Sequence, residues 1–78
     1  MRALTKEPLV WCYEILHEAG ALTAGDLTAR CNQRYGVRSQ DYWGKQLRAL
    51  ADLGYAKRTG RWCNSAPIWV AVAPDEQQ

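Results

Sequence analysis

Apolar positions near the N-terminus recur at the spacing of one face of a helix, which predicts an amphipathic helix. Its inward face comprises Leu9, Cys12, Tyr13, Leu16 and Ala19. Thr5 is placed as the N-cap, Pro8 falls in the first turn, where a missing N–H costs nothing, and Gly20 predicts the helix end. Trp11 and Ile15 lie off the inward face, so we expect the main core to cover both only partly.

A capping pattern predicts a second helix after a short extended link. Thr23 is followed three residues later by Asp26, a variant of the capping box with Asp in place of Glu or Gln. Leu22 and Leu27 flank this cap in the positions of a hydrophobic staple. The helix is predicted over about 24–34.

A third helix is predicted over 40–53, between Ser39 as its cap and Gly54 as its stop. Its buried stripe comprises Trp43, Leu47, Leu50 and Ala51. Its opposite side carries Asp41, Tyr42, Lys45, Arg48, Ala49 and Asp52. The core predicted from all three helices consists of Leu9, Tyr13, Leu16, Leu27, Trp43, Leu47 and Leu50.

Beyond the third helix the pattern changes to that of strands. Residues 55–59 are predicted as a strand, 60–66 as a loop and 67–72 as a second strand. The apolar face of the second strand comprises Ile68, Val70 and Val72. Pro67 at its first position is compatible with an edge strand.

Two segments carry a resemblance to a known family. Residues 47–55 have the form Leu-x-x-Leu-x-x-x-Gly followed by an apolar residue, and residues 22–27 read Leu-Thr-Ala-Gly-Asp-Leu. Over 7–72 the chain resembles the winged helix-turn-helix family of DNA-binding domains, in which the first segment closes helix three and the second enters helix two. The connection over 35–38 is longer and more basic than a tight turn, and the wing holds two bulky tryptophans, which departs from the family's pattern.

The resemblance implies an α+β, mainly α fold. It consists of a three-helix helix-turn-helix core with a C-terminal two- to three-stranded antiparallel wing. The expected division is an N-terminal extension over 1–5, the winged helix-turn-helix domain over 6–73 and a flexible tail over 74–78.

Charge is unevenly distributed along the 78 residues. The net charge is only +2, but residues 30–61 carry +6, between acidic flanks. Such a block suggests one face that binds a polyanion. The plainer interpretation is a solvated surface that happens to be basic, and charge alone leaves the two open.

The resemblance places helix three in the major groove of double-stranded DNA, where Gln pairs with adenine and Arg or Lys with guanine. Basic wing residues would contact phosphates or the minor groove. The candidate DNA-binding residues are Arg34, Arg38, Gln40, Tyr42, Lys45, Arg48, Lys57, Arg58 and Arg61. The opposing interpretation pairs Lys45 or Arg48 with Asp41 and Asp52, which leaves the wing alone to bind.

Other chemistry has little support. The three cysteines, Cys12, Cys31 and Cys63, have no C-x-x-C spacing, and His17 is not spaced as a finger ligand, so no metal site is expected. His17 also has no nucleophile and third group beside it at helical spacing, and no phosphate-binding glycine motif occurs, so we expect no enzyme and no cofactor. Without a signal peptide or an apolar span, a cytoplasmic protein that does not enter membranes is expected.

The leading hypothesis is a sequence-specific DNA-binding protein, a transcriptional regulator whose compact single domain would suit a phage or mobile-element gene. The alternative is a winged-helix module for protein–protein interaction within a larger nucleic-acid-processing complex. A homodimer or a protein partner would then use Trp11, Ile15 or the wing around Trp62. We favour packing of Trp62 across the hairpin, because a thin core needs large side chains, over stacking on a sugar or base.

Overall fold

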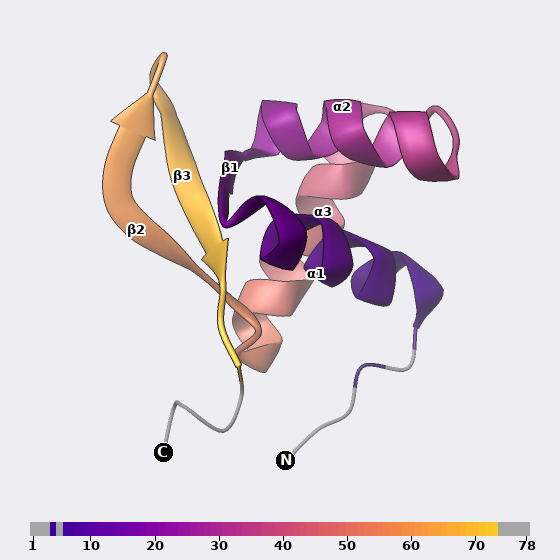
Figure 1. Ribbon diagram of the computed structural model, residues 1–78, viewed down its shortest axis with the longest axis horizontal. Coiled ribbons are helices and arrows are strands. Elements are labelled where there is room, and N and C mark those ends of the chain that lie inside the picture. The colour runs from indigo at the N-terminus through magenta and orange to yellow at the C-terminus, as the bar shows by residue number, and fades with distance from the viewer. Residues whose placement is uncertain (1–3, 5, 74–78) are drawn as a thin grey trace.

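The computed structural model describes Leu4 and residues 6–73. Three helices lie on one side of a small antiparallel sheet whose hairpin extends past them (Figure 1). The elements are α1 (Glu7–Ala19), β1 (Ala21–Thr23), α2 (Ala24–Tyr35), α3 (Gln40–Leu53), β2 (Ala56–Cys63) and β3 (Ala66–Ala71). The predicted fold class, a mainly helical α+β domain with an antiparallel wing, is confirmed. The hairpin β2–β3 is called the wing below.

Side chains cap two of the helices at the predicted residues. The Asp26 N–H donates to Thr23 Oγ1 at 3.2 Å, and the Tyr42 N–H donates to Ser39 Oγ at 3.1 Å. Each such cap stabilises a helix by about 1 kcal/mol. For α1 the N-cap position falls on Lys6, whose side chain makes no cap hydrogen bond. The predicted cap Thr5 lies outside the described residues, as does the predicted tail over 74–78.

The core lies between the three helices and the sheet. Its buried side chains include Leu9, Cys12, Leu16, Leu22, Leu27, Cys31, Trp43, Leu47, Leu50 and Trp69. Two predictions about α1 were wrong. Ile15 is only 6% exposed, because α2 lies over it and borders the same surface depression at Arg30 and Arg34. Tyr13 is only half-buried, since it stands at the rim of the core with its ring edge-on to Tyr55 at 5.4 Å.

The sheet has the strand order β1-β3-β2, all antiparallel. β3 is therefore the central strand, although Pro67 at its second position would also be compatible with an edge strand. Pro67 is tolerated because β1 pairs with β3 only as far as Ile68. The inward side chain is Trp69, which pairs with Leu22 and is buried, whereas Ile68 and Val70 are half-buried. Both faces of this strand are apolar in sequence, so alternation could not identify the inner one.

The wing is longer than predicted. Residues 60–63, expected in a loop, continue β2, with Trp62 paired to Pro67. An irregularity between Arg58 and Trp62, where Gly60 has φ of +88°, lets the strand resume its pairing. The turn is reduced to Asn64 and Ser65, both at positive φ, as a tight two-residue hairpin requires. The hairpin therefore projects further than a short wing would.

Candidate nucleic-acid interface

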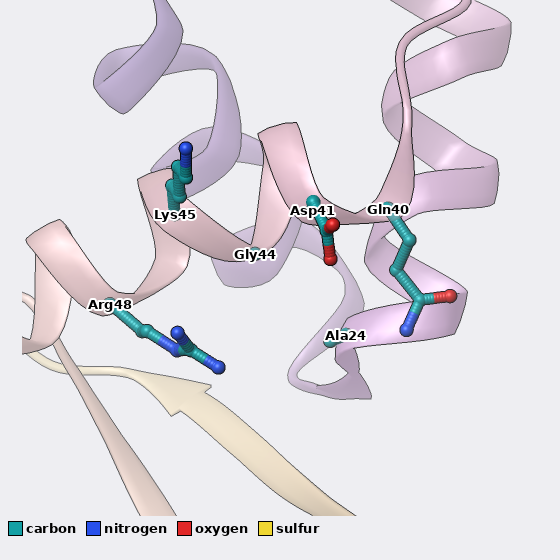
Figure 2. Close-up of a pocket in the computed structure, with 6 residues that line it drawn as sticks. All are labelled: Ala24, Gln40, Asp41, Gly44, Lys45 and Arg48. Atoms are coloured by element: carbon teal, nitrogen blue, oxygen red, sulfur yellow. The ribbon is translucent and has the colours of Figure 1, made fainter.

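A surface depression of about 340 Å³ runs along the exposed side of the first turns of α3. Its lining consists of Ala24, Gln40, Asp41, Gly44, Lys45 and Arg48. Arg48 and Asp41 extend into the space between α3 and the start of α2, while Lys45 points away from it (Figure 2). The N-terminal half of α3 therefore presents polar side chains beside an open channel.

A second depression, of about 230 Å³, continues the first toward the wing. Four lining residues are common to both depressions: Ala24, Gln40, Gly44 and Arg48. Its other lining residues are Leu47 on α3 and Arg58, Ser65, Ala66, Pro67 and Trp69 on the wing. We call the two depressions together the α3–wing groove. The floor is apolar toward the wing, and cations stand on both sides.

Two arginines flank this groove from different elements. Arg58 pairs with Trp69 across the wing, and its guanidinium carbon lies 5.1 Å from the centre of the Trp69 ring. This cation–π contact favours a guanidinium that stays over the groove. Arg48 approaches from α3 (Figure 2). Within the described part of the chain, no ion pair joins either arginine to a carboxylate, so both positive charges remain available to a ligand.

The expected neutralisation of α3 by its own acids does not occur as ion pairs. Neither Lys45 nor Arg48 forms a salt bridge with Asp41 or Asp52 among residues 6–73. Asp41 nevertheless lines the groove and contributes a negative charge there. The groove is therefore most positive at its wing end, where the carboxylate is absent from the lining.

Gly44 leaves the middle of the groove open. A Cβ atom built on it would meet no atom within 4 Å. A glycine inside a helix costs about 1 kcal/mol relative to alanine, and nothing in the fold requires one here. Gly44 thus gives a ligand close access to the α3 backbone at a cost in helix stability.

The remaining candidates, on the α2–α3 connection and on α3, contact other side chains of the chain. The Arg38 guanidinium carbon lies 5.5 Å from the centre of the Tyr42 ring, and that ring packs edge-on against Trp43 at 4.9 Å. Tyr42 is half-buried and does not line the groove. Arg38 and Tyr42 therefore support the start of α3 rather than form part of the groove.

Asn32 fixes this connection and was not foreseen from the sequence. Its Oδ1 atom accepts hydrogen bonds from the Trp43 Nε1–H at 2.7 Å and from the backbone N–H of Arg38 at 2.8 Å. One side chain of α2 thereby holds both the connection and α3. A polar residue three positions before the end of a helix gives no sequence signal for this role.

Arg34 lies away from the groove, between α1 and α2. It forms an ion pair with Glu18 at 3.0 Å, and that hydrogen-bonded contact raises the pKa of Arg34. Next to it, the Trp11 and Tyr35 rings stack at 4.5 Å. The α1 side chains expected to meet a partner are thus engaged within the chain: Trp11 stacks on Tyr35, and Ile15 is buried.

The other basic wing residues do not line the groove. Lys57 pairs with Val70, so it lies on the sheet face opposite that of Arg58. Arg61 is exposed in the irregular segment, where its N–H donates to Thr59 Oγ1 at 3.1 Å. Trp62 is 64% exposed, so the prediction that it packs across the hairpin into the core was wrong.

The cysteines differ in their surroundings. Cys12 and Cys31 are fully buried, and Cys63 is exposed on the wing. Hydrogen bonding with Cys31, together with burial, raises the pKa of the Cys12 thiol. Among the described residues, no three His, Cys, Asp or Glu side chains come together where a metal ion could be held. No helix in that part of the chain is long and apolar enough to cross a membrane.

Comparison with known proteins gives no match to a protein-family model, to a curated protein or to a solved structure. The layout of helices and antiparallel sheet is consistent with a winged helix.

Proposed function

We propose that this protein binds double-stranded DNA through α3 and the wing. The supporting observation is the α3–wing groove, which is flanked by two arginines from separate elements that have no carboxylate partner among the described residues. Unpaired guanidinium groups on both sides of one channel suit a phosphate backbone, because Arg binds phosphate oxygens in a bidentate manner.

In this proposal the major groove of the duplex receives the exposed side of α3, since it admits one helix. Gln40, which is exposed and lines both depressions, would face base edges and provide sequence preference. Arg48 and Arg58 would hold the backbone that borders the same major groove, which fixes the register of the helix. Sequence-specific binding by a chain of this size would suit a transcriptional regulator.

The first test compares the affinities of alanine variants for duplex DNA by fluorescence anisotropy. We expect Arg48→Ala and Arg58→Ala each to weaken binding about tenfold, as the loss of a charge-assisted contact does. Arg34→Ala is the matched control, because it removes the same charge from a surface ion pair outside the groove. Equal weakening by all three variants would mean that overall charge, and not the groove, determines affinity.

Protein binding is the second candidate function. Two large apolar side chains stand exposed among the described residues, Val37 at 83% and Trp62 at 64%. Exposed apolar residues can mark protein contacts. They lie on separate segments, the α2–α3 connection and the wing. A protein partner lost on substitution of either residue, with no DNA binding by the unmodified chain, would favour this candidate.

A further inference from the structure

Trp62 differs from the other three tryptophans in its exposure. Trp43 and Trp69 are buried at 1% and 7% exposure, and Trp11 stacks on Tyr35 with the rings 8° from parallel. Trp62 is 64% exposed near the end of the wing. An indole that is mostly in water contributes little to the core, so it is available to a ligand.

The wing around Trp62 is entirely cationic in its charged residues. Residues 56–73 include Lys57, Arg58 and Arg61 and no Asp or Glu. Charge complementarity therefore favours a polyanion as the occupant of this surface. An exposed aromatic ring among cations matches the way proteins bind single-stranded nucleic acid, where bases stack on aromatic rings and cations follow the backbone.

The register of the wing places Trp62 on the side of the groove. Trp62 is opposite Pro67, and Arg58 is opposite Trp69. Opposed residues share a sheet face, and Pro67 and Trp69 alternate onto the same face, which lines the groove. Arg58 and Trp62 therefore stand on one face, with Trp62 nearer the hairpin turn. A backbone held at Arg58 can continue toward the indole.

We propose that Trp62 stacks on an unpaired base at the point where a bound duplex ends or opens. Stacking on a base within an intact duplex would first require two base pairs to separate, whereas an unpaired base offers a free face. The chain would thus bind a duplex with a single-stranded extension more tightly than the same duplex with blunt ends. This inference rests on the proposed DNA binding and adds a preference for one class of DNA end.

The test measures affinity for a blunt duplex and for the same duplex with a thymidine extension on one strand. The unmodified chain should bind the extended duplex at least about fivefold more tightly, the lower end of what one base–aromatic stack provides. Trp62→Ala should bind both with the blunt-duplex affinity, and Trp62→Phe should retain part of the preference. Val37→Ala, the control, alters the other exposed apolar side chain and should leave the ratio unchanged.

Intrinsic fluorescence gives a readout at the residue itself. Trp62 is the most exposed tryptophan, so acrylamide should quench it preferentially in the free protein. The extended duplex should protect this emission, and Trp62→Phe should abolish the protected component. Because the side chain is exposed, both variants should keep the melting temperature of the unmodified chain.

The outcomes separate the two proposals. Equal affinity of the unmodified chain for blunt and extended duplexes, or equal weakening of both by Trp62→Ala, would overturn the stacking of an unpaired base while leaving DNA binding intact. Failure of the unmodified chain to bind either duplex at low salt would overturn both the proposed DNA binding and the proposed stacking of Trp62.

Discussion

Single residues decide how closely a ligand can approach α3. Gly44 is placed in the middle of the α3–wing groove, with Arg48 one turn later on the same side. Its missing side chain leaves open space over the helix backbone. The free protein gains no contact from this glycine, and the proposed DNA binding would use the open space for close approach to the α3 backbone.

Gly44→Ala should raise the free energy of unfolding and lower the affinity for DNA. The helix gains about 0.5–1 kcal/mol of unfolding free energy, since alanine is the better helix former and its Cβ meets no neighbour. DNA binding should weaken, because the methyl group occupies the channel beside Arg48. Urea unfolding and anisotropy titration measure the two effects. A stabilised variant with unchanged affinity would show that the backbone of α3 is not approached there.

At the scale of elements, the contact between α2 and α3 depends on one amide. Asn32 Oδ1 serves both the Trp43 indole and the connection that precedes α3. Since Trp43 is 1% exposed, its indole N–H depends on this acceptor for a partner within the fold. The orientation of the proposed DNA-reading helix is therefore set from α2.

Asn32→Ala should lower the free energy of unfolding by about 1–3 kcal/mol, the cost of leaving a buried donor without a partner. Asn32→Asp keeps an oxygen acceptor at the same place and should retain most of that stability. Urea unfolding of the pair, with the near-ultraviolet signal of Trp43, checks this. Equal loss in both variants would mean that the amide nitrogen, and not Oδ1, matters.

The elements differ in how far the sequence predicted them. Helices α2 and α3 follow from local capping by Thr23 and Ser39, which the structure reproduces. The wing was predicted too short, because an irregular strand containing Gly60 has the composition of a loop. The burial of Trp69 could not be predicted from β3 alone, because its partners are distant in sequence and both strand faces are apolar. Of the predicted apolar face, Val72 is buried, and Ile68 and Val70 are half-buried.

The candidate site could be predicted only where its residues follow a local pattern in the sequence. Exposed residues of one helix share a side through simple periodicity, which identified Gln40, Lys45 and Arg48. The pairing of Arg58 with Trp69, and the ion pair that occupies Arg34, depend on tertiary register. No local pattern in the sequence contains that information.

Across the whole molecule, the modest net charge of +2 conceals an uneven pairing of charges on its two sides. On the α1–α2 side, Glu18 neutralises Arg34 and Glu14 accepts a hydrogen bond from Tyr35 at 3.4 Å. On the α3–wing side, Arg48 and Arg58 have no such partner in the described chain. Arginines without a carboxylate partner on one side only would favour binding of a polyanion in a defined orientation.

The salt dependence of binding to a duplex of random sequence tests DNA binding through the α3–wing groove most directly. Phosphate contacts by the groove predict a steep linear fall of log affinity with log salt concentration. Replacing both Arg48 and Arg58 with alanine should reduce the slope by about two, because each lost phosphate contact removes about one. Arg34→Ala should leave the slope unchanged. A shallow slope for the unmodified chain, or the same slope for the double variant, would contradict DNA binding through the α3–wing groove.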